Sequence, residues 1–155
     1  MAERTVPHNI EAEESVLGSL LIDPEALFRV APFLRSDDFY IRKNAWVYEV
    51  ILDLHERREP VDFLTVCTEL EARGQLEEIG GAAYVSQLIN TVPSAINVEA
   101  YGRIVEQTAI RRRLITAAGD IAQLAYQEAE EVGQVLDRAE QTLFGVSQRR
   151  LVRDI

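Results

Sequence analysis

The sequence predicts an all-α protein in which a compact multi-helix head is followed by a long antiparallel helical hairpin. Apolar residues recur at helical spacing through nearly the whole chain, and no segment shows the sustained alternation of a strand. Prolines and glycines divide the first part into short elements, whereas no proline follows Asn97. We therefore expect a head over residues 1–96, a hairpin over 97–148 and the start of a linker over 149–155.

The head begins with two consecutive helices. Asn9 is a favourable N-cap, and the carboxylates that follow it lie where the helix dipole favours negative charge. Asp23–Pro24 ends the first helix and starts the second, because aspartate caps well and proline fits the first helical position. A turn at 36–38 precedes a longer helix that runs to about Arg57. The apolar face of that longer helix consists of Trp46, Val47, Val50, Ile51 and Leu54.

Two shorter helices complete the head. Asp62 caps a helix that ends at Gly74, where glycine commonly follows a C-terminus. Gly80–Gly81 opens the last short helix, and Pro93 terminates it.

The hairpin is predicted from two long apolar patterns separated by an acidic turn at 127–131. The first helix, from Asn97 to about Tyr126, carries two apolar rows, although closing a two-helix hairpin requires only one. One row is Ile110, Leu114, Ala117, Ile121 and Leu124. The other row is Ile104, Ile115, Ala118, Ala122 and Ala125. The second helix carries a single seam of Val132, Val135, Leu136, Ala139, Leu143 and Val146.

The extra apolar row needs a covering surface. We expect it to pack against a second copy of the chain, and the alternative is that it rests on the head. The expected self-association residues are Ile110, Leu114, Ala118, Ala122, Leu136 and Leu143.

Composition and charge exclude several classes of function. No apolar run approaches the about 18 residues that a membrane helix needs, and Cys67 is the single cysteine, so we expect a soluble intracellular protein. Residues 1–97 carry 17 acidic and 8 basic side chains, an excess of 9 negative charges. Because DNA affinity comes largely from basic groups, the head is not expected to bind DNA. It suits a basic protein partner, or is an ordinary solvated surface.

No set of residues predicts catalysis. His8 and His55 lack the spacing of a metal-ligand pair, and Cys67 lies in an apolar helix without an obvious base. The acidic pairs Asp37–Asp38 and Glu77–Glu78 are explained by capping of helix starts. Three arginines, Arg111 to Arg113, point in three directions from one helical turn. This arrangement favours an ion pair between chains, with Arg112 near a carboxylate on a neighbouring head, or a solvated surface, over DNA contact.

A nucleotide-driven motor requires the phosphate loop G-x-x-x-x-G-K-[ST]. Lys43 is the only lysine and has no glycine near it, so these residues contain no such loop.

Four stretches of the chain nevertheless resemble, in the same order, the N-terminal domain of bacterial DnaB-type replicative DNA helicases. They are Pro7–Pro24, Glu59–Asp62, Leu76–Tyr84 and Pro93–Tyr101. The resemblance implies a non-catalytic, cytoplasmic and nucleoid-associated collar domain that forms a dimer, or a trimer of dimers within a hexamer. It also implies docking of the primase C-terminal helicase-binding domain and, in some lineages, of a helicase loader. ATP and Mg²⁺ would belong to a motor domain outside these residues, which themselves need no cofactor.

Carried onto this chain, the resemblance implies primase contacts at Glu11, Tyr84, Ile115 and Ile121. Tyr84 follows the double glycine at a helix start, where its side chain is expected to project from the head. Ile115 and Ile121 lie on different apolar rows, so they are not expected to face the same neighbour. Ordinary packing is the alternative for each residue.

Three other classes of protein remain as alternatives. A stand-alone adaptor or anti-helicase factor could mimic the collar, and the helicase-binding end of a primase is expected to have a similar fold. The helicase-binding end of a primase would need a catalytic domain upstream, yet Met1 starts directly on the helicase-like opening. A small helical enzyme is disfavoured because the acid–base and metal-binding sets are missing.

Overall fold

The computed structural model describes residues 5–154, with side chains described for residues 5–148. Over that range the regular structure is entirely helical, which confirms the predicted all-α class. The elements in chain order are α1 (Ile10–Ile22), η1 (Pro24–Arg29), η2 (Ser36–Asp38), α2 (Arg42–Glu56), α3 (Phe63–Ala72), α4 (Ala82–Ile89), α5 (Val98–Tyr126) and α6 (Val132–Asp154), where η marks a 3-10 helix.

The chain divides into two compact units, and the division falls inside α5. His8–Glu106 forms the head unit, and the residues from Gln107 onward, together with the segment that ends at Pro7, form the hairpin unit. Sequence analysis placed this boundary at Asn97, where α5 is about to begin. The first turns of α5 belong to the head unit because Val98 and Val105 are fully buried in its core.

The predicted local signals are present in the head unit. The side chain of Asn9 accepts a hydrogen bond from the backbone N–H of Ala12 at 2.9 Å and so caps α1. Asp23 caps η1 in the same way through the N–H of Glu25, at 3.1 Å, so the predicted second helix is a 3-10 helix. Asp62 and Thr65 cap α3 reciprocally with two bonds of 2.9 Å. Gly74 follows α3 with a φ of +71°, a conformation that favours glycine.

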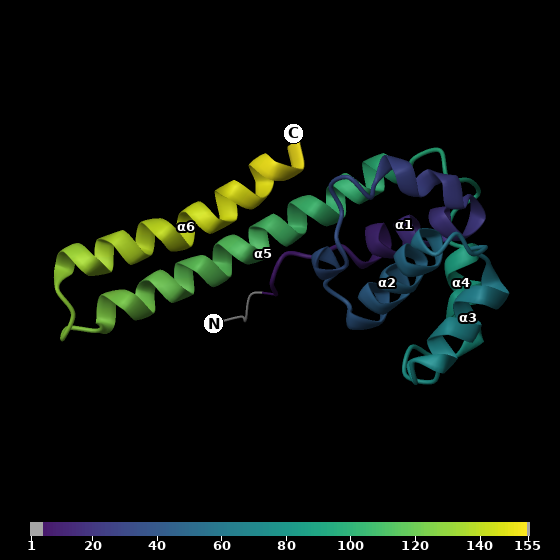
Figure 1. Ribbon diagram of the computed structural model, residues 1–155, viewed down its shortest axis with the longest axis horizontal. Helices are drawn as coiled ribbons and strands as arrows, with labels where there is room; N and C mark the ends of the chain where they lie inside the picture. The colour runs from purple at the N-terminus through teal and green to yellow at the C-terminus, as the bar shows by residue number, and fades with distance from the viewer. Residues whose placement is uncertain (1–4, 155) are drawn as a thin grey trace. The chain divides into compact units, whose positions relative to one another are not determined.

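The core of the head unit lies where α1 packs on α2, α4 and η1, and where α3 packs on α2 and α4 (Figure 1). Large side chains with no more than 2% exposure include Leu17, Leu20, Leu34, Tyr48, Ile51, Leu54, Leu70, Ile79 and Leu88. The α1 and α4 backbones approach closely at Gly18. A Cβ atom at that position would lie 2.2 Å from the carbonyl oxygen of Leu88.

A buried carboxylate joins three helices of the head unit. Glu13 of α1 is 1% exposed, and its Oε2 accepts a 2.7 Å hydrogen bond from the N–H of Tyr40. Its Oε1 accepts from the N–H of Ile41 at 3.3 Å and from the Asn44 side chain at 3.0 Å. Because Ile41, the N-cap of α2, offers no side-chain bond, Glu13 caps α2 from another helix. The Asn44 oxygen in turn accepts from the hydroxyl of Tyr84 in α4.

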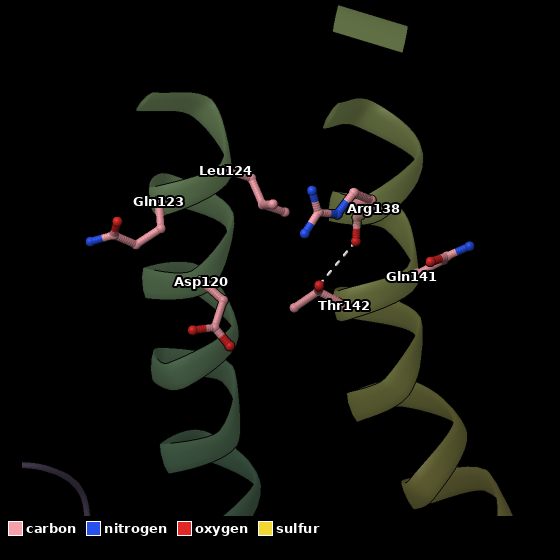
Figure 2. A pocket seen from close by; sticks show the side chains of 6 residues that line it. All are labelled: Asp120, Gln123, Leu124, Arg138, Gln141 and Thr142. Atoms are coloured by element: carbon pink, nitrogen blue, oxygen red, sulfur yellow. Dashed lines mark hydrogen bonds between the residues drawn. The ribbon is translucent and has the colours of Figure 1, made fainter. Parts of the chain in front are cut away.

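The helices of the hairpin unit are the second part of α5 and α6, which run antiparallel side by side (Figures 1 and 2). The six residues of the predicted seam on α6 share one helical stripe but differ in burial from one side of it to the other. Val135, Ala139 and Val146 are half-buried, whereas Val132, Leu136 and Leu143 are exposed. Residues 149–154, expected to begin a linker, continue α6 instead, and residue 155 lies outside the described residues.

Candidate partner-binding surfaces

The described residues contain no group of histidine, cysteine and carboxylate side chains that could hold a metal ion. His8 stacks on Tyr40 with ring centroids 4.5 Å apart, and His55 meets Phe28 edge-on at 5.1 Å. Cys67 is buried, and burial raises the pKa of its thiol, which makes it a poor nucleophile at neutral pH. In the part of the chain that the structure describes, no helix is both long and apolar enough to span a bilayer.

The acidic pairs have different surroundings from each other. Asp38 accepts a 2.8 Å hydrogen bond from the N–H of Arg35 and thereby stabilises η2, as capping predicted. Glu77–Glu78 lies in the turn before α4 rather than at a helix start.

Tyr84 does not project from the head, and that expectation is wrong. The residue is 6% exposed, its hydroxyl donates to the Asn44 side chain, and the Lys43 ammonium lies 4.0 Å from its ring centroid. Burial raises the pKa of the Tyr84 hydroxyl, and the negative charges of Glu14 and Glu13 act in the same direction. The physical reason is that the apolar face of α4 faces the core, which takes Tyr84 inward with Val85 and Leu88.

Glu11, in contrast, is exposed at the first turn of α1. It lies at a hollow of about 320 Å³ within the head unit. The hollow is lined by Asn9, Glu11, Ala12, Ser15, Thr91, Val92, Pro93, Tyr101 and Ile104. A carboxylate beside apolar side chains can pair with a cationic group of a binding partner. The neighbouring apolar side chains can at the same time bury an apolar group of that partner.

The two apolar rows on α5 differ in exposure. In the first row, Ala117 and Leu124 are buried, and Ile110 and Ile121 are half-buried. Leu114 of that row is exposed. The second row is exposed along its whole length, at Ile104, Ile115, Ala118, Ala122 and Ala125. The two candidate docking residues of α5 therefore lie in different environments, with Ile115 at 50% exposure and Ile121 half-buried.

On α6, Leu136 is 58% exposed and Leu143 is exposed as well. Phe144 is also exposed, and sequence reasoning missed it although it lies two helical turns beyond Leu136. The buried apolar residues among the described side chains of the hairpin unit are Ala109, Ala117 and Leu124. Both hairpin helices therefore present more large apolar side chains to solvent than they bury.

A polar hollow of about 400 Å³ lies between the facing helices of the hairpin unit. Figure 2 shows Asp120, Gln123 and Leu124 on α5 opposite Arg138, Gln141 and Thr142 on α6. The Thr142 hydroxyl donates to the backbone carbonyl of Arg138 at 2.9 Å, and the Arg138 guanidinium pairs with Glu130 at 2.6 Å. Leu124 points from α5 toward α6 in this stretch, whereas Gln123 and Gln141 point away from the facing helix (Figure 2).

The arginine run on α5 makes one contact that sequence reasoning did not foresee. Arg111 is exposed, whereas the Arg112 guanidinium donates to the backbone carbonyl of Pro7 at 2.8 Å. The pairing of Arg112 with a carboxylate on a neighbouring head stays a prediction, because the structure holds one copy of the chain.

Comparison with known proteins gives a consistent set of similarities. The family described as "DnaB-like helicase N terminal domain" matches residues 5–107. The replicative DNA helicase DnaB of Geobacillus stearothermophilus is 45% identical over 149 residues, covering 96% of this chain and 33% of that protein. The replicative DNA helicase DnaC of Bacillus subtilis is 44% identical over 148 residues, with 96% and 33% covered. The chain spans about one third of the length of these relatives.

Two solved structures are similar as well. The N-terminal domain of DnaB helicase from Mycobacterium tuberculosis superposes with a TM-score of 0.87 at 43% identity, covering 92% of this chain and 99% of that one. The N-terminal domain of DnaB helicase from Helicobacter pylori, described together with its interactions with primase, has a TM-score of 0.65 at 25% identity. That match covers 76% of this chain and 91% of the other.

Proposed function

The chain belongs to the DnaB-like helicase N-terminal domain family, and we propose that it acts in DNA replication by joining helicase subunits into a collar and docking primase on that collar. The second apolar row of α5, which is exposed along its whole length, carries this proposal, because such a surface needs a partner. The domain would act in the cytoplasm, where the chromosome is replicated.

The chain contributes binding surfaces rather than turnover to this function. Its 155 residues contain no phosphate loop, and the family that it matches is defined by an N-terminal domain. The relatives that extend beyond it are replicative DNA helicases. In the whole protein, ATP and Mg²⁺ would be used by a motor domain outside these residues.

Self-association is supported by the exposed apolar side chains of both hairpin helices. Leu136 and Leu143 of α6 lie on one exposed face, and Ala118 and Ala122 of α5 are small enough to let another helix approach closely. An interface between copies would remove these side chains from water at a gain of about 25 cal/mol for each Å² of apolar surface buried.

We expect the double substitution Leu136→Glu and Leu143→Glu to abolish self-association, because it places two charges in the apolar interface. Sedimentation velocity should show dimers or larger species for the wild-type chain and monomers for the variant. Leu64→Glu is the matched control, since Leu64 is 71% exposed in α3 of the head unit and should leave the oligomer intact. A wild-type chain that stays monomeric at the highest attainable concentration would contradict the proposal.

Primase docking is supported by the exposed carboxylate of Glu11 beside its hollow and by the exposed side chain of Ile115. In a titration with the C-terminal domain of primase from the same organism, followed by calorimetry, Glu11→Lys or Ile115→Ser should raise the Kd about tenfold or more. Phe63→Ser is the control, because Phe63 is an exposed apolar residue of α3. Tyr84→Ala is unsuitable as a probe, since it removes a buried side chain.

The titration should be repeated with the assembled oligomer, because a site shared between copies is incomplete in a monomer. Saturable binding that Glu11→Lys and Ile115→Ser leave unchanged would place the primase site elsewhere. Absence of binding in both forms would leave self-association as the function of the domain.

A further inference from the structure

We propose that a groove between η1 and α2 of the head unit binds a basic segment of another protein through an apolar anchor side chain. The groove has a volume of about 460 Å³ and lies in a part of the head separate from Glu11 and its hollow. It is distinct from the surfaces assigned above to self-association and primase docking. Its lining combines an apolar floor with carboxylates.

The apolar part of the groove is formed by Leu27, Phe28, Ala31 and Leu52. Leu27 is almost fully buried at its base, and Leu52 of α2 is half-buried beside it. Phe28 is 63% exposed, and its ring is held by an edge-on contact with His55, with centroids 5.1 Å apart. An aromatic side chain that is fixed in position yet exposed is a favourable contact for an apolar anchor, because it loses little conformational entropy on binding.

The carboxylates lie on the face of α2 that borders the groove. Asp53 and Glu56 line the groove and are three residues apart, which places them on one side of the helix. Asp53 forms a 2.7 Å ion pair with Arg73, whereas Glu56 forms no ion pair with any described residue. The carboxylate of Glu56 is thus available to a cationic group that enters the groove.

The charge of the surroundings selects the kind of occupant. Residues 1–97 carry 17 acidic and 8 basic side chains, so the field around the head attracts cations and repels nucleic acid. A second copy would bring a net charge of −10 toward this acidic surface. A basic segment of a different protein is the occupant that matches both the apolar floor and the charged rim.

Such a segment would bind as a helix or strand with one apolar side chain against Phe28 and Leu52. Lysine or arginine residues one turn away would then reach Glu56. The apolar contact supplies affinity, and the charges supply specificity and a faster encounter.

The probe for this proposal is a fluorescein-labelled amphipathic peptide built of leucine and lysine, and its counterpart has glutamate in place of every lysine. Fluorescence anisotropy should show saturable binding of the lysine peptide and an affinity that falls as salt is added. Phe28→Ala and Glu56→Lys should each raise its Kd about tenfold or more. Leu64→Ala, which changes an exposed leucine that does not line the groove, should leave the Kd unchanged.

Circular dichroism of each variant should match the wild type, because Phe28 and Glu56 are surface residues. Absence of lysine-peptide binding, or equal binding of the glutamate peptide, would overturn the proposal. Equal binding by the wild type and the Phe28→Ala variant would also overturn it. A loss of self-association in Phe28→Ala would identify a second copy as the occupant and would likewise overturn it.

Discussion

Replacing Gly18 by alanine should destabilise the head unit by about 3 kcal/mol, which is among the largest effects that a single added methyl group can have. The new Cβ would lie 2.2 Å from the carbonyl oxygen of Leu88 and 3.3 Å from its carbonyl carbon. Both atoms belong to the backbone of α4, so relief requires the two helices to move apart. Alanine normally stabilises a helix interior by about 1 kcal/mol relative to glycine, and the clash must outweigh that gain.

Urea unfolding followed by circular dichroism measures this effect. Gly119→Ala is the matched control, since Gly119 lies within α5 and a Cβ there would meet nothing within 4 Å. That control should be neutral or stabilising by up to about 1 kcal/mol. If both variants were equally stable, the close approach of α1 and α4 at Gly18 would be disproved.

Replacing Glu13 by alanine should cost about 3 kcal/mol, because it removes the cap of α2. The backbone N–H groups of Tyr40 and Ile41 and the Asn44 amide would each lose a partner in a buried place. A buried donor left without an acceptor costs about 1–3 kcal/mol, partly offset where water can enter. Glu13→Gln should lower the stability less than Glu13→Ala does. The amide oxygen of glutamine still accepts a hydrogen bond, whereas its NH₂ group would face other donors and cannot accept from them.

Denaturant unfolding gives the free energies, and amide hydrogen exchange gives the location. Exchange at Tyr40 and Ile41 should accelerate in Glu13→Ala beyond the global change in stability. Glu11→Gln, two residues earlier on the exposed face of α1, should change stability by less than about 0.5 kcal/mol. Unchanged exchange at Tyr40 and Ile41 would show that α2 does not depend on this carboxylate.

The head could be predicted from its sequence where the determining interactions are local. Asn9, Asp62 and Gly74 act within a few residues of themselves, so their types and positions suffice to mark helix ends. The cap of α2 could not be found in this way, because its acceptor, Glu13, is supplied by α1. Sequence reasoning assigned that carboxylate to the dipole of its own helix.

The same distinction between local interactions and those supplied by another helix explains which features of the candidate surfaces could be predicted. The exposure of the second α5 row was predictable. The partner helix of a two-helix hairpin covers one apolar row, so a helix with two such rows leaves the other uncovered. The orientation of Tyr84 was not, because it depends on which face of the short α4 meets α1. The unequal burial of the α6 seam also escaped prediction, since its six apolar positions all fit one broad helical stripe.

The polar hollow between α5 and α6 has a consequence for how the hairpin unit behaves at low concentration. Two helices whose buried apolar contacts are mainly two alanines and a leucine gain little stability from one another. Whatever binds their exposed faces therefore supplies part of the free energy that keeps them helical, by mass action. If copies of the chain associate through these faces as proposed, dilution should loosen the hairpin unit before it loosens the head unit.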